Sequence, residues 1–309
     1  MDIAEISKNN STFTSTENVR NRIKELKNIN LSSISLDELD KMLNNVFEFI
    51  PFPAGLIAQD KIIYRARVNE NEKEFENITD LGIKPKELVM HFGRANLPNE
   101  SIFYSASNLG LACAEVLHNL KDSYNRKIKI AVTTISEWKI QKEIYISPIF
   151  NSKSVLNIRK DMESIIKKNS KYFLSKELLK KDIIDISDLI LEFFSDEFSK
   201  NNIVTPDDYK LSVWYVYNLT RLNDIAMEKY GRKKYDGIAY PGVAMKYRGD
   251  NIALFNFDLD SKIKFITAYK IICTNYDFEN GKFDFAKIRK VDSVDKNGKL
   301  NWIDLDRKL

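Results

Sequence analysis

The N-terminal part of the chain spaces its apolar residues with the period of an α-helix. This pattern predicts helices over about 17–29 and 36–49. The second helix opens with a capping-box sequence, in which Ser35 and Glu38 satisfy each other's backbone donors. Pro51 follows it, and a proline ends a helix because it has no backbone N–H to donate. We therefore expect a helical segment over residues 1–60.

Strand-like patterns come next. Residues 61–68 and 102–106 are rich in β-branched and aromatic side chains, which favour strands. Residues 127–135 alternate polar and apolar positions, as a half-buried strand does. Ser107 and Asn108 are good helix caps, so a helix is predicted from there to about residue 121.

The middle of the chain, about 152–230, has a helical pattern. Its last helix is predicted to begin at Thr205, which is followed by a proline and two acids, and to end before Gly231. Large apolar side chains in this segment predict an enlarged core, and a partner-docking surface is the alternative. These side chains are Phe193, Phe194, Trp214, Tyr215 and Tyr217.

The C-terminal part of the chain has a β pattern. Strands are predicted at 236–241, 251–257 and 262–274. Asn280-Gly281 and Asn297-Gly298 are hairpin signals with strand-like residues on both sides. The hairpins either extend the sheet or form a small appended module. Helices and strands in this order predict an α+β fold.

Composition narrows the class of protein. The 309 residues are 43% hydrophobic and 30% charged, enough apolar content for a sizeable core. The chain has two cysteines, Cys113 and Cys273, too few for a disulfide framework, so we expect a cytoplasmic protein. No stretch approaches the length needed to span a membrane, and none resembles a signal peptide. The net charge of +4 is spread among many acids, so no direct nucleic-acid binding is expected.

The sequence lacks the motifs of several enzyme classes, namely dinucleotide-binding, P-loop, serine-hydrolase and zinc-protease enzymes. The sequence contains no GxGxxG, no GxxxxGK[ST], no GxSxG and no HExxH. The two histidines, His91 and His118, are not at metal-ligand spacing with the cysteines, so we expect no metal site. An enzyme built on this chain would have to work with arginines, a carboxylate and an aromatic hydroxyl.

The helix after residue 108 carries such a carboxylate. Its apolar stripe recurs at helical spacing and must pack against the sheet. The stripe consists of Leu109, Ala112, Cys113, Val116, Leu117 and Leu120. Glu115 lies off this stripe, beside Leu111 and His118. One interpretation of Glu115 is a solvated glutamate, and the other is a residue in the wall of a cleft.

Three blocks of this sequence together resemble the RES-domain family. Residues 91–120, HFGRANLPNESIFYSASNLGLACAEVLHNL, resemble the family's GRWN-type loop, its strand ending in tyrosine and its glutamate-bearing helix. Upstream, Ile63-Tyr64-Arg65 resembles the opening strand. Downstream, residues 235–243 and 249–255 resemble the closing YDGI-YPSV and NLALF signature. The blocks stand in the family's order and frame residues 61–257, with a helical insertion over about 152–230.

The resemblance implies a fold and an activity. It predicts a mixed sheet like that of ADP-ribosyltransferases. Residues 258–309 exceed a minimal RES domain, as a C-terminal β extension of it or a small appended module. Family members consume NAD⁺ by phosphorolysis or hydrolysis, or transfer ADP-ribose to a macromolecule. The resemblance therefore implies NAD⁺ as the substrate and inorganic phosphate as a candidate co-substrate. It also implies a toxin that an Xre-like helix-turn-helix antitoxin neutralises by covering the active site.

The same resemblance implies a role for individual residues. Catalytic roles fall to Glu115, Arg65 and Tyr104, and substrate-binding roles to Arg94, Asn96, Tyr240, Gly242 and Asn251. The residue types suit cleavage of the nicotinamide–ribose bond. A carboxylate stabilises the positive sugar carbon of the transition state, two guanidiniums can fork onto a diphosphate, and a tyrosine ring can stack on nicotinamide. Taken singly, each arginine is equally a surface residue or an ion-pair partner, and a lone tyrosine is more often core.

The sequence departs from the family pattern at two positions. Gly242 stands where the family has a serine, so a hydroxyl is missing there. Ser105, Ser107 or a water is expected to replace it, or the activity is weakened and the chain is a binding module. Ala95 stands where the GRWN-type loop commonly has an aromatic residue.

Overall fold

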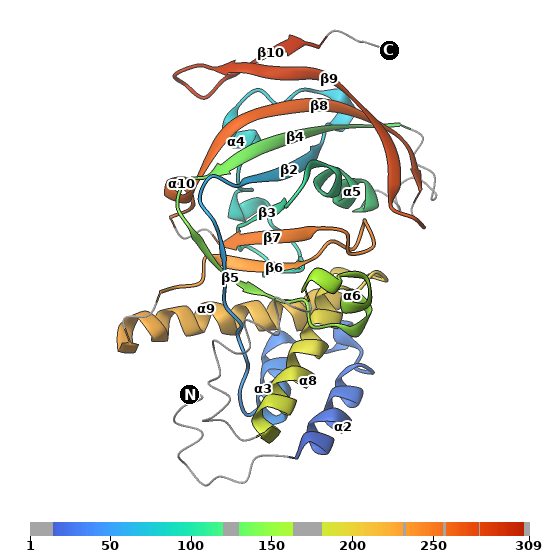
Figure 1. Ribbon diagram of the computed structural model, residues 1–309, viewed down its shortest axis with the longest axis vertical. Helices are drawn as coiled ribbons and strands as arrows, with labels where there is room; N and C mark the ends of the chain where they lie inside the picture. The colour runs from blue at the N-terminus through green and yellow to red at the C-terminus, as the bar shows by residue number, and fades with distance from the viewer. Residues whose placement is uncertain are drawn as a thin grey trace. The chain divides into compact units, whose positions relative to one another are not determined.

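The protein consists of two compact units. The computed structural model describes residues 15–119, 130–162, 181–230, 233–255, 258–277 and 279–305 (Figure 1). Unit 1 consists of Met1–Gly55, His91–Leu97 and Ser147–Tyr235, and unit 2 of Leu56–Met90, Pro98–Ile146 and Asp236–Leu309. The helices of the predicted N-terminal segment and those of the midchain insertion thus belong to one unit, although more than 90 residues separate them in sequence.

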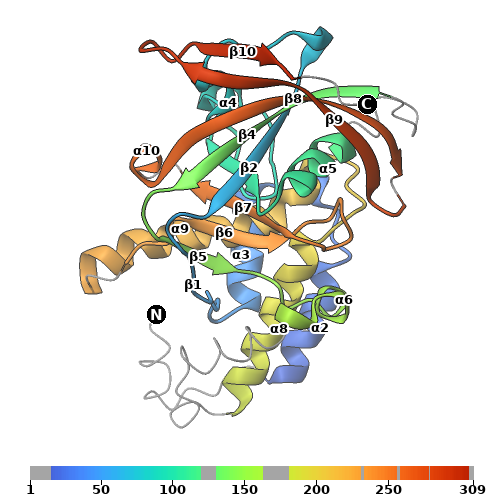
Figure 2. The ribbon, with the colours of Figure 1, turned by 45° about the horizontal axis from the view of Figure 1, so that its top comes forward.

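The described strands form one sheet. They are β1 (Gly55–Ile57), β2 (Ile62–Val68), β3 (Ile102–Ala106), β4 (Ile130–Ile140), β5 (Ile144–Pro148), β6 (Gly237–Pro241), β7 (Asp250–Phe255), β8 (Ile263–Asp277), β9 (Lys282–Val294) and β10 (Leu300–Asp304). Their order across the sheet is β1-β5-β6-β7-β3-β2-β4-β8-β9-β10 (Figure 2). Helices and this sheet together make the mixed architecture that the α+β prediction requires.

Most predicted strands are present close to their predicted bounds. β2 and β3 match the predictions, and β4, β6, β7 and β8 overlap theirs; residues 127–129 and 256–257 lie outside the described residues. β5 was not predicted, because no glycine or proline turn separates it from β4. Both hairpins are confirmed, with Gly281 at φ +63° and Gly298 at φ +85° in the turns. β8 pairs along its length with β4, so the C-terminal strands extend the sheet.

One helix of unit 2 packs on a face of the sheet. This helix, α5 (Leu109–Asn119), buries Leu111, Ala112, Cys113, Ala114 and Leu117. Leu111 and Ala114, which the predicted stripe left out, are thus buried. The cause is a second cover, the loop between β6 and β7, which packs on the side of α5 that carries Glu115. Leu109 and Val116 of the predicted stripe are only half-buried, and Leu120 lies outside the described residues. The shorter helices of unit 2 are α4 (Ile78–Leu81) and α10 (Leu259–Lys262).

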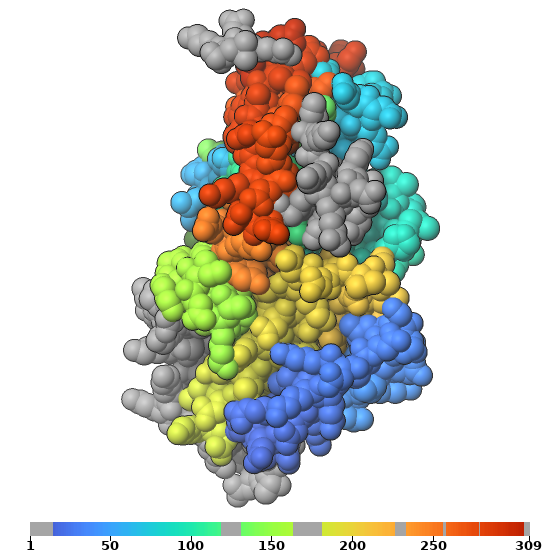
Figure 3. Space-filling model, turned by 90° about the vertical axis from the view of Figure 1, so that its right-hand side faces the viewer, coloured from blue at the N-terminus to red at the C-terminus, as the bar shows by residue number. Residues whose placement is uncertain are grey.

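Unit 1 is built from helices around an aromatic core. Its α-helices are α2 (Thr16–Leu26), α3 (Leu36–Val46), α6 (Lys153–Ile158), α8 (Lys181–Phe198) and α9 (Lys210–Tyr230). α2 and α8 lie side by side, blue and yellow in Figure 3. The predicted capping box of Ser35 and Glu38 is present, and so is the cap at Thr205. No helix in the described ranges has the length and apolarity needed to cross a membrane.

The large aromatic side chains of unit 1 are mostly core. The Phe194 ring lies 5.7 Å from the Phe47 ring, 5.9 Å from Trp214 and 4.8 Å from Tyr215, measured between ring centroids. Phe193, Phe194, Trp214 and Tyr215 are fully buried, which confirms the enlarged-core interpretation for these four. Tyr217 differs, because 37% of its surface is exposed.

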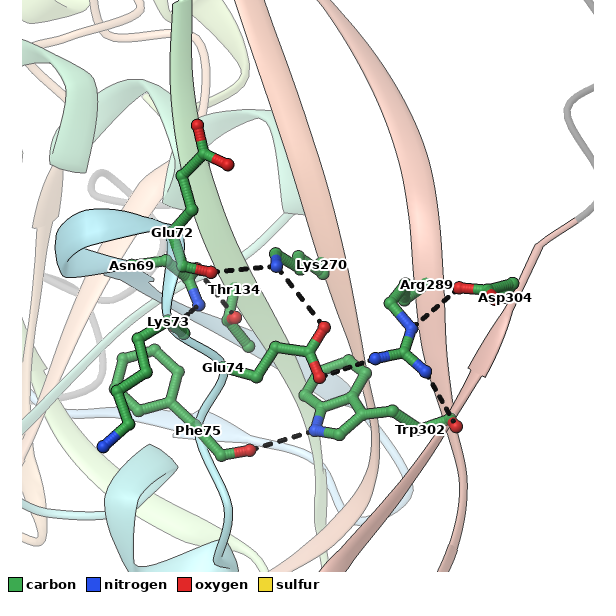
Figure 4. A network of polar contacts seen from close by, with 10 residues as sticks. All are labelled: Asn69, Glu72, Lys73, Glu74, Phe75, Thr134, Lys270, Arg289, Trp302 and Asp304. Carbon is green, nitrogen blue, oxygen red and sulfur yellow. Dashed lines mark hydrogen bonds and ion pairs between the residues drawn. The ribbon is translucent and has the colours of Figure 1, made fainter.

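A polar network holds the segment after β2 against the C-terminal strands (Figure 4). Glu74 accepts hydrogen bonds from Arg289 Nη1 at 2.6 Å and from Lys270 Nζ at 3.4 Å. Trp302 Nε1 donates to the Phe75 carbonyl at 2.9 Å. Burial acts to raise the pKa of Glu74, but the hydrogen bond and charge of Arg289, helped by Lys270, outweigh it and lower that pKa. The network therefore joins chain segments about 200 residues apart.

A matched pair of phenylalanines tests the core of unit 2. Phe103→Ala is expected to lower the free energy of unfolding by about 3–5 kcal/mol, because its side chain is 0% exposed and lies 5.2 Å from the Trp138 ring. Phe285→Ala removes the same atoms from a side chain that is 47% exposed, and is expected to cost less than about 1 kcal/mol. Equilibrium urea unfolding of both variants measures the difference, and equal losses would contradict the packing.

Candidate functional site

The three sequence blocks become neighbours in the sheet of unit 2. The third block forms β6 and β7, and the first lies in β2. The second forms β3 and α5, except that its first residues, His91–Leu97, belong to unit 1. These strands are adjacent, in the order β6-β7-β3-β2. Tyr240 pairs with Asn251, which pairs with Ala106 of β3, and Ala106 pairs in turn with Tyr64. The second and third blocks, more than 100 residues apart in the sequence, are thus brought into one part of the sheet.

Glu115 ties the second block to the third. Its Oε1 accepts a hydrogen bond from Asn251 Nδ2 at 2.8 Å and one from the Ala244 backbone N–H at 3.3 Å. The other oxygen, Oε2, has no hydrogen bond to any part of the chain that the structure describes. Glu115 is half-buried. The carboxylate is therefore oriented through one of its two oxygens.

A tyrosine from β8 holds the other side of the same loop. The Tyr276 hydroxyl lies 3.3 Å from the carbonyl oxygen of Ala244 and 3.4 Å from that of Ala114. Burial, and next the negative charge of Glu115, raises the pKa of Tyr276 above its ordinary value. The phenol therefore stays protonated and can donate to these carbonyls. Ala244 is thus held by hydrogen bonds at both its N–H and its carbonyl. These contacts fix the position of the N–H that donates to Glu115.

Tyr104 and Asn251 face the α5 side of the sheet. Successive side chains of a strand point to opposite faces, and Ala106 of β3 packs against Leu111 and Ala112 of α5. Tyr104, two residues earlier in β3, shares that face. Asn251 shares it too, since its side chain reaches Glu115 on α5. Tyr240 is buried in β6. The structure thus places Tyr104, Asn251 and Glu115 on the same side of the sheet.

Arg65 points to the other face. Tyr64 and Ala66 pack against the α5 cluster, so Arg65 between them is directed away from α5. Its guanidinium is buried, lies 5.0 Å from the centroid of the Phe103 ring, and donates to the Tyr104 carbonyl at 2.7 Å. Burial, and next the charge of Arg67, lowers the pKa of Arg65 to about 9, which leaves it protonated at neutral pH. Arg65 thus holds β2 to β3 where the two strands share a single paired position.

Arg94 and Asn96 belong to unit 1. Arg94 donates from Nη1 to the Phe198 carbonyl at 3.0 Å and from Nη2 to the Lys200 carbonyl at 2.7 Å. A cation at these carbonyls stabilises the C-terminal end of α8, where acceptors lack partners. Asn96 is buried and donates from Nδ2 to the carbonyls of His91 and Leu97. In the described contacts both side chains hold their own unit together.

The two departures from the family pattern have packing reasons. A Cβ atom at Gly242 would lie 2.5 Å from Cδ1 of Leu111, so a serine there requires Leu111 to move. Ala95 is fully buried, which leaves no space for an aromatic ring. The expected substitutes for the serine hydroxyl are already engaged. Ser105 Oγ donates to the Ile252 carbonyl at 3.2 Å, and Ser107 Oγ accepts from the Asp250 N–H at 3.0 Å.

No sequence pattern predicted the cavity at the C-terminal end of β2. This cavity of about 800 Å³ is lined by residues 66–68, several residues of the 70–80 segment, and Val116 of α5. Its ionisable side chains are two bases, Arg67 and Lys73, and four acids, Glu70, Glu74, Glu76 and Asp80. This lining has a formal charge of −2, which does not suit a diphosphate. Of its acids, Glu74 is already committed to Arg289 and Lys270.

Comparison with known proteins adds no family assignment. No protein-family model matches the chain, and no curated protein matches it either. Within the described residues no group of three or more His, Cys, Asp or Glu side chains could hold a metal ion. The resemblance to the RES-domain family therefore depends on the three blocks themselves.

Replacing Asn251 tests the tie between the blocks. Asn251→Ala removes the hydrogen bond to Glu115 and is expected to lower the free energy of unfolding by about 1–3 kcal/mol. Asn251→Asp places a second carboxylate 2.8 Å from Glu115 Oε1, so it is expected to be the less stable variant at neutral pH. The difference in free energy of unfolding between Asn251→Asp and Asn251→Ala should vanish as the pH falls below about 4, where the introduced carboxyl becomes protonated. Urea unfolding at several pH values measures this, and equal stability of the two variants at neutral pH would contradict the contact.

Proposed function

We propose that unit 2 carries an NAD⁺-consuming site centred on Glu115. The observation that carries the proposal is the anchored carboxylate itself: Asn251 and the Ala244 N–H hold Oε1, and Oε2 has no partner among the described residues. The second support is that the three RES-like blocks are adjacent in the sheet, because a family site made of three distant blocks requires such adjacency.

Glu115 acts on the sugar in this proposal. When the nicotinamide–ribose bond breaks, the bonding electron pair leaves with nicotinamide and the ribose carbon becomes positive. A fixed carboxylate facing that carbon stabilises the charge where it develops. An oxygen of water or inorganic phosphate then bonds to the carbon. For water, the free Oε2 can accept the proton that the new bond releases. Tyr104, on the same face, is proposed to contact the nicotinamide ring.

Arg65 and Arg94 have different roles in this proposal. Arg65 is a positioning residue, because its guanidinium binds the Tyr104 carbonyl and so fixes the strand that carries Tyr104. The grip of Arg65 and Arg94 on a diphosphate, which the resemblance implies, stays a prediction. Arg94 already binds two carbonyls of unit 1, and Arg65 is directed away from α5. The proposed reaction does not require either guanidinium to touch the substrate.

The biological setting follows from the same resemblance. We propose that NAD⁺ loss arrests growth, that the protein acts in the cytoplasm, and that an Xre-like helix-turn-helix antitoxin neutralises it. An antitoxin that covers Glu115 would block the site without altering the sheet.

Glu115→Gln tests the proposal with little change in shape. A glutamine carbonyl can accept the same two hydrogen bonds, so the variant is expected to fold, but it lacks the charge that stabilises the sugar carbon. NAD⁺ consumption is expected to fall by about 10²–10³-fold, measured as nicotinamide release with and without inorganic phosphate. The matched control is Glu192→Gln in α8, a side chain that is 27% exposed, which should keep full activity. Intact NAD⁺ at high concentrations of the unaltered protein would overturn the proposal.

A second candidate function is a catalytically weakened RES-like binding module. The packing of Leu111 against Gly242 and the prior commitment of both arginines favour it. If the site is weakened, Gly242→Ser in a Leu111→Ala background should cleave NAD⁺ at least about tenfold faster than Leu111→Ala alone, since a tenfold change needs only about 1.4 kcal/mol. Our proposal expects no such gain.

ADP-ribose transfer to a macromolecule is the remaining alternative for the acceptor. With labelled NAD⁺, label that stays on protein or nucleic acid would assign a transferase. Free ADP-ribose or its phosphate would assign hydrolysis or phosphorolysis.

A further inference from the structure

The two cysteines of the chain meet in the core of unit 2. Cys113 lies on α5 and Cys273 on β8, 160 residues apart in sequence, and their Sγ atoms are 2.9 Å apart. Both are free thiols with almost no exposed surface. A disulfide has an S–S bond of about 2.0 Å. The two sulfur atoms are thus within about 1 Å of bonding distance, without any need to move α5 or β8 to another register.

The pair lies in a mostly apolar cluster, and the Thr133 hydroxyl is near both sulfur atoms. Leu117, Ile135 and Ile271 belong to the same buried cluster. Thr133 Oγ1 lies 3.9 Å from Cys113 Sγ and 3.8 Å from Cys273 Sγ. A structural role in packing needs only small apolar side chains at both positions, and it gives no reason for the two sulfur atoms to approach so closely.

The two thiols differ in their ease of ionisation. The contact between the two thiols lowers the pKa of Cys273, and its hydrogen bond with Thr133 acts in the same direction. The pKa of Cys113 is raised by its hydrogen bond to Cys273 and by burial. Because the thiolate is the nucleophilic form, Cys273 is the thiol that reacts first with an oxidant.

We propose that Cys113 and Cys273 form a redox modification site, which a peroxide converts into an intramolecular disulfide between α5 and β8. The Cys273 sulfur attacks one oxygen of hydrogen peroxide and the O–O bond breaks. The thiol proton of Cys273 goes to the leaving hydroxide, so the products are a sulfenic acid and one water. The Cys113 sulfur then attacks the sulfenic sulfur, its thiol proton leaves with the hydroxyl as a second water, and the S–S bond forms. The two sulfurs lose two electrons in total, and the peroxide gains them.

The disulfide would join two elements that already support Glu115. Glu115 follows Cys113 by two residues on α5, and Tyr276 follows Cys273 by three on β8. The Tyr276 hydroxyl contacts the carbonyls of Ala114 and Ala244, and the Ala244 N–H binds Glu115. The bond would close a chain loop of 160 residues, and a loop of this length strongly restricts the unfolded chain. The oxidised protein is therefore expected to melt at a higher temperature than the reduced protein. This inference does not rest on the proposed NAD⁺ activity.

The test is oxidation of the folded, full-length protein. Reduced protein is treated with hydrogen peroxide in native buffer, the peroxide is removed, and the sample is denatured and alkylated with iodoacetamide. We expect an intact mass lower by two hydrogen atoms, no alkylated cysteine, and a proteolytic peptide pair joined through Cys113 and Cys273. Dithiothreitol should restore two alkylatable thiols. The melting temperature should rise on oxidation and return on reduction.

Single variants provide the matched controls. Cys113→Ala and Cys273→Ala keep a small apolar side chain at each buried position, so both are expected to fold. Neither can form the bond, so peroxide should leave each with an unshifted melting temperature. The proposal is overturned if the unaltered protein keeps both thiols alkylatable, if it acquires sulfinic or sulfonic acids without a cross-link, if it forms only intermolecular disulfides, or if the cross-link forms only in urea.

Discussion

The packing of α5 on the sheet is the constraint on which the candidate site depends. Leu111, Cys113 and Leu117 bury one side of the helix, and this fixes the direction in which Glu115 points. The β6–β7 loop covers the other side of α5, which carries Glu115. There Asn251 and the Ala244 N–H donate hydrogen bonds to the Glu115 carboxylate. Leu111 has a part in both contacts, because it also fills the space where a Cβ atom at Gly242 would lie. The same packing that buries α5 thus orients its glutamate.

Much of the fold could be predicted from local sequence. The capping box at Ser35, the strand over 102–106 and the glycine turns at Gly281 and Gly298 depend on neighbouring residues only, and each is present. β5 was not predicted, because a five-residue strand without a turn signal has no local mark. The pairing of β8 with β4 is a long-range contact, and the sequence left open whether the C-terminal strands join the sheet.

The side chains of the candidate site were harder to predict than its elements. Residue type suggested that Arg65 and Arg94 bind phosphate, but the direction of Arg65 depends on the pleat of β2 and on the face that α5 covers. Arg94 instead donates hydrogen bonds to carbonyls at the end of α8, more than 100 residues away in sequence. Neither contact leaves a local pattern. Two cysteines are too few to predict a disulfide framework. That the sulfur atoms of Cys113 and Cys273 lie close together follows only from the packing of α5 on β8.

We propose that NAD⁺ binds to one face of unit 2, beside Glu115. A crystal structure of the Glu115→Gln variant grown with NAD⁺ tests it most directly, because the variant should bind the substrate without consuming it. We expect the nicotinamide ribose to lie next to residue 115, on the α5 side of the sheet and near Asn251 and Tyr104. NAD⁺ bound elsewhere, or absent from well-ordered crystals soaked at high concentration, would contradict the proposal.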